Sequence, residues 1–200
     1  MPQAITPITP DDGLTTAERR QRGVVIVNTG DGKGKTTAAF GTALRGWHQG
    51  WRIGVFQFVK SGRWHSGEQH ALEVLGASGE GGSVDWHIMG SGWSWARSKG
   101  SGDDRAALAR QGWDEVARRL ADHTHDLYVL DEFTYPMARG WVDAGEVAST
   151  LATRPGRQHV IITGRGCPTQ IIDIADLVTD MTKVKHPFDQ GQRGQRGIEW

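Results

Sequence analysis

Residues 24–37 read VVIVNTGDGKGKTT, and this stretch decides the fold of the chain. It opens as an apolar, β-branched run, which is typical of a buried parallel strand. Glycines then break the run, and the stretch ends in Gly-Lys-Thr, followed by residues compatible with a helix. A strand, a glycine-rich loop and a helix N-terminus in this order are typical of a phosphate-binding loop.

The residue types of this loop suit a bound phosphate chain. Glycines let consecutive backbone N–H groups turn inward without Cβ clashes and form an anion nest. Lys35 is predicted to place its ammonium against phosphate oxygens, and the Thr36 hydroxyl is predicted to reach a Mg²⁺ ion. The predicted nucleotide-binding residues of the loop are Gly30, Asp31, Gly32, Lys33, Gly34, Lys35, Thr36 and Thr37.

The loop departs from the common pattern in length. That pattern is G-x-x-x-x-G-K-[ST], whereas Gly30 and Gly34 enclose only Asp31, Gly32 and Lys33, so the loop is one residue short. A plainer interpretation is a glycine-rich turn in an α/β domain that binds no nucleotide. The order of strand, loop, Lys-Thr and helix favours a nucleoside triphosphate site, but one in which the triphosphate need not lie as it does in an ordinary ATPase.

Composition limits the class of protein. The 200 residues suit a single domain with a tail, and a formal net charge of zero gives no electrostatic footprint for nucleic acid or an anionic membrane. A single cysteine, Cys167, excludes an internal disulfide, and the eight histidines show no H-x-x-x-H pair, so we expect no zinc site. We find no signal peptide and no bilayer-spanning stretch, and we therefore expect a cytoplasmic protein without a membrane partner.

Strand-like and helix-like stretches alternate along the chain. Residues 1–22 are expected to form a flexible arm, with Thr15 and Glu18 as a capping box for a short helix, and residues 23–200 to form the domain. After the first strand, the expected strands are 52–59, 84–89, 127–130, 159–163 and 177–181. The expected helices are 35–49, 68–75, 103–120, one capped by Asp143 with Glu146 completing a capping box, and 168–175. This alternation predicts a three-layer α/β/α sandwich with a mostly parallel sheet, the P-loop nucleotide-binding (RecA-like) fold.

Three other groups of residues are candidates for chemistry. Asp131 and Glu132 end an apolar strand, where a carboxylate can hold Mg²⁺ opposite the Thr36 hydroxyl, although such residues are often caps or surface groups. Trp93 and Trp95 lie in a glycine-flanked loop and suit either core packing or a flat apolar ligand. Arg165 follows another strand and suits either a phosphate contact or a solvated surface.

Together these motifs resemble a known family, the P-loop type of ATP:corrinoid adenosyltransferase (cob(I)yrinic acid a,c-diamide or cob(I)alamin adenosyltransferase). The resemblance covers residue 23 to the C-terminus. The matching segments, in chain order, are TGDGKGKTTAAFG (29–41), VFQFVK (55–60), GE (67–68), GWSW (92–95), VLDE (129–132), RP (154–155), IITGRG (161–166), ADLVT (175–179), KHPF (185–188) and GIE (197–199).

The resemblance implies a reaction and its participants. The 5′-deoxyadenosyl group of ATP, the co-substrate, is transferred to Co(I) of a corrinoid, and triphosphate is released. Lys35, Thr36 and Glu132 would be the catalytic residues, with Mg²⁺ (or Mn²⁺) held by Thr36, Glu132 and Asp131. Trp93, where the family typically has phenylalanine, and Trp95 would face the corrinoid. A homodimer and a flavin-type electron donor such as flavodoxin are also implied.

Two other functions stay open from the residues alone. A P-loop NTPase or kinase-like switch would hydrolyse the γ-phosphate, but such proteins need a residue that positions water and often an arginine finger, and the sequence marks neither. A corrinoid carrier without catalytic activity would have no use for the phosphate-binding loop.

Overall fold

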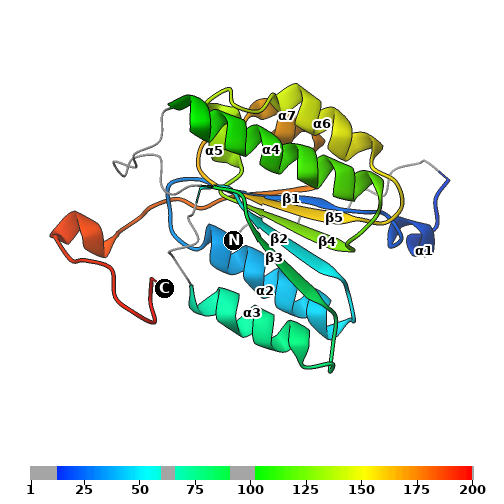
Figure 1. Ribbon diagram of the computed structural model, residues 1–200, viewed down its shortest axis with the longest axis horizontal. Helices are drawn as coiled ribbons and strands as arrows, with labels where there is room; N and C mark the ends of the chain where they lie inside the picture. The colour runs from blue at the N-terminus through cyan, green and yellow to red at the C-terminus, as the bar shows by residue number, and fades with distance from the viewer. Residues whose placement is uncertain (1–12, 60–65, 91–101, 200) are drawn as a thin grey trace, which may run out of the picture.

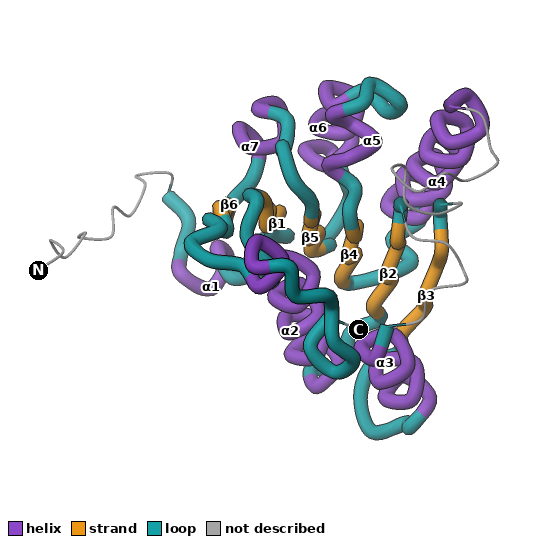
Figure 2. Tube along the Cα trace, turned by 90° about the vertical axis from the view of Figure 1, so that its left-hand side faces the viewer, coloured by secondary structure: helices purple, strands orange, loops and turns teal. Residues whose placement is uncertain are grey.

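The computed structural model describes residues 13–59, 66–90 and 102–199, and within them the chain forms one six-stranded, all-parallel sheet in the order β3-β2-β4-β5-β1-β6. Figure 2 shows this order across the molecule. The predicted α/β fold with a parallel sheet is confirmed. The strands are β1 (Val25–Thr29), β2 (Ile53–Gln57), β3 (Val84–Ile88), β4 (Leu127–Asp131), β5 (His159–Thr163) and β6 (Leu177–Asp180).

Helices cover both faces of the sheet and complete the three layers (Figure 1). On one face lie α2 (Lys35–His48) and α3 (Gly67–Ala77); on the other lie α4 (Gly102–Ala121), α5 (Thr134–Ala138), α6 (Ala144–Thr153) and α7 (Thr169–Ile174). A short α1 (Thr16–Arg19) precedes β1, and a 3₁₀ turn, η1 (Pro187–Gln190), follows β6. None of the helices in the described ranges has both the length and the apolar character needed to cross a bilayer.

Each face of the sheet has its own apolar core. Side chains of α2 and α3, such as Phe40 and Leu72, pack against Val55 and Ile161 on the first face. On the second face, the predicted stripe of α4 is buried, with Trp113 at its centre. β4 is buried along its whole length because it lies between two strands and two helical layers.

Local signals placed most helix ends correctly. α2 ends at His48, and Gly50 follows with a φ of +78°, the left-handed conformation expected of a glycine after a helix. The capping box of Thr15 and Glu18 is present. The capping box predicted at α6 is wrong in one half: Asp143 accepts from the Glu146 N–H, but the Glu146 carboxylate instead accepts hydrogen bonds from Arg110 and Trp113 of α4.

Candidate nucleotide-binding site

The glycine-rich loop joins β1 to α2 at the carboxyl edge of the sheet. Gly30 and Gly34 have φ values of +94° and +110°, which only glycine adopts easily. A Cβ on Gly32 would lie 2.5 Å from the Met181 carbonyl oxygen, and the Gly32 N–H donates to that same oxygen. The glycines are therefore required by the chain that leaves β6 as well as by the turn itself.

Lys35 is held inside the loop. Its Nζ donates to the carbonyl oxygens of Gly30 (2.8 Å) and Gly32 (2.6 Å), and the residue is buried. Burial, followed by the positive charge of Arg165, lowers the pKa of Lys35 below its usual value. The loop thus holds a cation among backbone groups, next to the N-terminus of α2, where the helix dipole favours an anion.

The second predicted element, the acidic end of β4, lies directly beside Thr36. The Thr36 hydroxyl donates to Asp131 Oδ1 (2.7 Å), and the Thr163 hydroxyl donates to the same oxygen (2.9 Å). The Gln57 side chain donates to Asp131 Oδ2 (3.0 Å), so the fully buried carboxylate has partners from both neighbouring strands.

Glu132 follows with an unusual backbone. Its φ is +58°, a left-handed conformation that non-glycine residues rarely adopt and that often marks functional positions. Its N–H donates to the Thr163 hydroxyl (3.0 Å), which holds this conformation in place. Glu132 lines the same cavity as Thr36.

Arg165 comes from the loop after β5 and lies against the phosphate-binding loop. Its Nη2 donates to the Asp31 carbonyl oxygen (3.4 Å), and its Nε is 3.8 Å from the Asp31 carboxylate. The Arg165 carbonyl accepts from the Thr134 hydroxyl of α5 (2.8 Å), which fixes the loop from the opposite side. Arg165 thus adds a guanidinium charge to the loop, next to the ammonium charge of Lys35.

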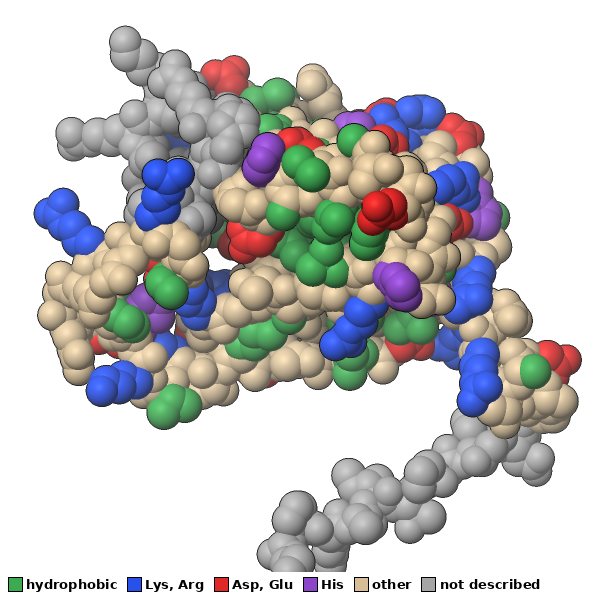
Figure 3. Space-filling model, turned by 90° about the horizontal axis from the view of Figure 1, so that it is seen from below, with side chains coloured by type: hydrophobic (Ala, Val, Ile, Leu, Met, Phe, Trp, Pro, Cys, Tyr) green, Lys and Arg blue, Asp and Glu red, His purple; other side chains and the backbone are tan. Residues whose placement is uncertain are grey.

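These residues surround a cavity of about 730 Å³. Its apolar wall includes Phe40 and Val59, and the C-terminal tail contributes Ile198 and Glu199 to its lining. Figure 3 shows, at the left, the hollow between this tail and the body of the molecule. The cavity is lined by Asp31, Gly32, Lys33, Gly34, Lys35, Thr36, Thr37, Phe40, Val59, Ser66, Glu68, Glu132, Tyr135, Arg165, His186, Gly194, Ile198 and Glu199.

The tail makes one direct contact with the loop that sequence reasoning did not predict. Lys33 Nζ forms an ion pair with Glu199, so a loop cation is paired with a tail carboxylate. Lys183, at the start of the same tail, is paired with Asp189 of η1. Trp93 and Trp95 lie outside the described residues.

The arrangement suits a polyphosphate bound together with a divalent cation. The cavity lining combines cationic side chains and a helix N-terminus with hydroxyl and carboxylate oxygens. Gln57 and Thr163 also belong to this polar layer. The signal that could have revealed them is a polar residue at the end of each apolar strand next to β4.

Comparison with known proteins gives one consistent result. The family model described as "ATP:corrinoid adenosyltransferase BtuR/CobO/CobP" matches residues 21–200. The chain is 44% identical to "Corrinoid adenosyltransferase CobA" of Salmonella typhimurium over 189 residues, 94% of this chain and 91% of that protein. It is 42% identical to the corrinoid adenosyltransferase of Escherichia coli K12, with the same coverage. It is 37% identical to that of Pseudomonas aeruginosa, over 91% of this chain and 86% of that protein.

Proposed function

The chain belongs to the ATP:corrinoid adenosyltransferase family, and from this premise we propose how its own residues transfer the 5′-deoxyadenosyl group of ATP to a corrinoid. The triphosphate of ATP lies along residues 30–37, between Lys35 and Arg165. The adenosine extends into the cavity along its apolar wall, formed by Phe40, Val59 and Ile198.

The reaction is a substitution at carbon. The electron pair of Co(I) forms the cobalt–carbon bond to C5′ of the ribose, the bond between C5′ and oxygen breaks, and triphosphate leaves with that bonding pair. The nucleophile carries its own electron pair, so the protein needs no general base. Its tasks are to position the two substrates and to stabilise the charge on the leaving triphosphate.

The described residues are suited to stabilising that charge. Lys35 and Arg165 place two cations beside the loop, and Lys33 adds a third that is now paired with Glu199. The backbone N–H groups at the start of α2 add partial positive charge without a reorganisation cost. We propose that the triphosphate displaces Glu199 and takes over the Lys33 ammonium.

The oxygen donors of the site fit Mg²⁺ or Mn²⁺, both of which prefer hydroxyl and carboxylate oxygens. Thr36 and Asp131 are already hydrogen-bonded to each other, and Glu132 lines the cavity beside Thr36. Because Asp131 accepts hydrogen bonds from three side chains, we propose Thr36 and Glu132 as direct ligands and Asp131 as a ligand through water. The ion would neutralise charge on the phosphate oxygens.

Other parts of the proposal rest on the resemblance to the family. Trp93 and Trp95 are proposed to face the corrinoid, where bulky rings would displace its lower axial ligand and make reduction to Co(I) easier. A flavin-type donor such as flavodoxin is proposed to supply the electron, and the enzyme is proposed to work as a cytoplasmic homodimer. Substrate competition assays between a complete cobalamin and an early precursor would identify the preferred corrinoid.

The observation that carries the proposal is the contact of Thr36 with Asp131 beside the buried Lys35, in a chain of this family. The test mixes the protein, Mg-ATP and chemically reduced cobalamin under anaerobic conditions. We expect tripolyphosphate in a one-to-one ratio with a light-sensitive cobalt–carbon product. Release of ADP and phosphate without corrinoid would support a γ-phosphate hydrolase and contradict the proposal.

A further inference from the structure

A second group of side chains that can bind a metal lies away from the phosphate-binding loop, and two of its members, Asp85 and His87, are on β3. Alternate residues of a strand point to opposite faces, and Val84 and Trp86 pack on the α2 side of the sheet. Asp85 and His87 therefore point to the other face, where His87 stacks on Phe56 (ring centroids 4.8 Å apart). None of the residues proposed for catalysis belongs to this cluster.

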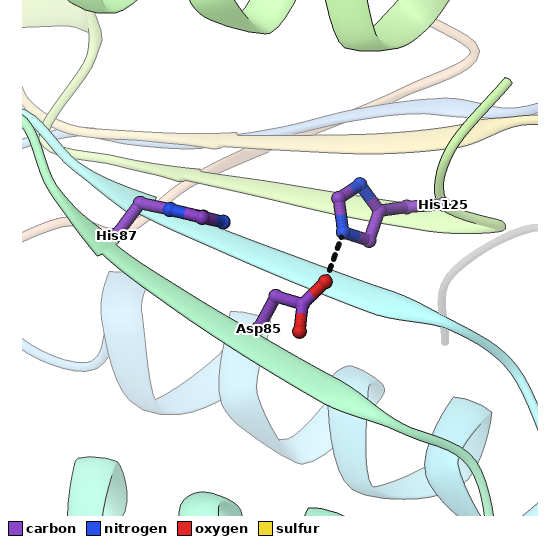
Figure 4. Close-up of side chains that lie close together, drawn as sticks. All are labelled: Asp85, His87 and His125. Atoms are coloured by element: carbon purple, nitrogen blue, oxygen red, sulfur yellow. Dashed lines mark hydrogen bonds and ion pairs between the residues drawn. The ribbon is translucent and has the colours of Figure 1, made fainter. Parts of the chain in front are cut away.

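His125 completes the cluster from a different part of the chain. It precedes β4, is fully buried, and its Nε2 lies 2.9 Å from Asp85 Oδ2. One ligand atom each from Asp85, His87 and His125 all lie within 4.8 Å of one another. Figure 4 shows the His87 ring projecting from β3 toward the other two side chains.

One ring nitrogen of the cluster has an unmet hydrogen-bonding capacity. His87 Nε2 is buried and finds no hydrogen-bond partner among the described residues. A buried polar atom without a partner is costly and calls for an explanation, such as a bound ion. The nitrogen lies on the ring that Figure 4 shows turned toward Asp85 and His125.

The backbone is built to let His125 reach β3. Gly54 of β2 is the register partner of Asp85, and β2 lies between β3 and β4, the strand that His125 precedes. A Cβ on Gly54 would lie 3.0 Å from both Cε1 and Nδ1 of His125, and the missing side chain leaves room for the ring. Nδ1 of His125 contacts the Thr124 hydroxyl (3.0 Å), the kind of outer partner that orients a metal-binding imidazole.

The charge state of the cluster is compatible with a cation. Burial lowers the pKa of both His87 and His125, so both rings are neutral near pH 7, the form that binds metals. The positive charge of Arg119 acts on both histidines and disfavours a cation, but its Nε is paired with Glu115 at 2.6 Å. Asp85 has a half-exposed side chain, which gives an ion a path from solvent.

We propose that Asp85, His87 and His125 form a binding site for a divalent transition metal, with Zn²⁺ as the main occupant. Two imidazoles and one carboxylate are a donor set that Zn²⁺ takes in tetrahedral geometry, with water as the fourth ligand. In that geometry, neighbouring ligand atoms lie about 3.3 Å apart, given bonds of about 2.0–2.1 Å. Small side-chain rotations reach this arrangement from the present spacing. When Nε2 of His125 binds the ion, the single proton of the neutral ring is carried on Nδ1, which faces the Thr124 hydroxyl.

The bound metal ties the edge strand β3 to the start of β4, across β2. β3 pairs with a single strand, β2, and His125 gives it a second attachment. The role is therefore structural, and it is independent of ATP and of the corrinoid.

Zn²⁺ and Co²⁺ titrations of the full chain test this site. The protein carries no histidine tag and is first stripped with a chelator; calorimetry follows Zn²⁺, and visible absorption follows Co²⁺. We expect one saturable equivalent and a rise in the melting temperature with Zn²⁺. His87→Gln and Asp85→Asn should each weaken binding at least about tenfold. His70→Gln, at an exposed histidine of α3, is the matched control and should bind as the unmodified chain does.

Two results would overturn the proposal. One is the absence of saturable binding to the stripped protein. The other is binding that His87→Gln and Asp85→Asn leave unchanged, which would place the ion elsewhere. These two variants carry the test because replacing the fully buried His125 could disturb folding by itself. Far-ultraviolet circular dichroism of each variant without metal checks that the fold is kept.

Discussion

The Thr36 hydroxyl donates a hydrogen bond to Asp131 Oδ1 over 2.7 Å, and this bond joins the first turn of α2 to the last residue of β4. The two residues are far apart in sequence, and the sheet brings them together because β4 and β1 flank the same strand, β5. The bond holds both oxygens at the edge of the sheet where we propose that Mg²⁺ binds.

Glu132→Gln should reduce kcat/KM for ATP about 100-fold and raise the Mg²⁺ concentration needed for half-maximal activity, because the variant lacks the charge proposed to hold the ion. Asp131→Asn should give a smaller loss of Mg²⁺ affinity, since its proposed contact passes through water. Mg²⁺ titrations of both variants measure the difference. A larger Mg²⁺ effect for Asp131→Asn would reverse the proposed roles of the two carboxylates.

Lys35→Ala should lower kcat/KM by about 100-fold or more, as expected when a charged donor to a developing anion is removed. Arg45→Ala, at an exposed position near the end of the same helix, is the control and should stay within about twofold. Initial rates of tripolyphosphate release at several ATP concentrations give the comparison. Near-normal kcat/KM for Lys35→Ala would remove this residue from the mechanism.

Glu199→Gln should bind ATP more tightly, because the tail carboxylate no longer competes with phosphate for Lys33. Exposed ion pairs contribute up to about 1 kcal/mol, so the expected gain in affinity is about fivefold at most. Equilibrium titration with a fluorescent ATP analogue measures it at low and high salt. Asp189→Asn, which breaks the tail ion pair with Lys183, is the matched control. Weaker binding by Glu199→Gln would show that the carboxylate helps to hold the nucleotide.

Gly164→Ala should destabilise the protein by roughly 2–4 kcal/mol, because strain at positive φ adds to a severe clash. The φ of Gly164 is +135°, and a Cβ there would lie 2.1 Å from the Thr134 hydroxyl oxygen. Gly166→Ala has a positive φ but open space around its Cβ, so it should cost only about 1 kcal/mol. Urea unfolding of the two variants measures the difference. Equal losses would show that the clash relaxes without cost.

Stability should fall as the pH drops below about 6.5, because burial dominates and lowers the pKa of His125 below 6.5 in the folded chain. Between the folded and unfolded pKa values the unfolded chain binds more protons, so the free energy of unfolding decreases toward acid and is fully recovered above pH 6.5. Asp85 opposes this shift, whereas Arg119 and Arg52 add to it. Urea unfolding from pH 8 to pH 5, with chelator present, tests it. A flat profile in that range would contradict the prediction.

The features that could be predicted from the sequence are mainly those that depend on residues close together in the chain. The β-branched run before the glycines predicted β1, and Gly50 predicted the end of α2, because both signals depend on neighbouring residues. The acidic pair Asp131 and Glu132 was predicted opposite Thr36 because it ends an apolar strand in a chain with a phosphate-binding loop upstream. In the structure, Thr36 and Glu132 line one cavity, and Asp131 accepts a hydrogen bond from Thr36.

Contacts between distant segments could not be predicted from the sequence. Glu146 fits a local capping box, yet Arg110 and Trp113 of α4 bind its carboxylate, since tertiary partners outcompete a local one. The ion pair of Glu199 with Lys33 depends on the path of the tail. The cluster of Asp85, His87 and His125 was not predicted, because a local spacing of ligands in the sequence cannot reveal a third ligand from a distant segment.

The position of β1 in the sheet also has a consequence for how the protein is made. β1 pairs with β5 and β6, and the hydrogen bond from the Val24 N–H to His159 spans 135 residues. During synthesis, β1 therefore cannot pair with β5 or β6 until most of the chain has left the ribosome. Closing such long loops is slow. We therefore expect the phosphate-binding loop to complete its contacts only after β5 and β6 have emerged, and nascent chains that end before β5 should fail to retain nucleotide.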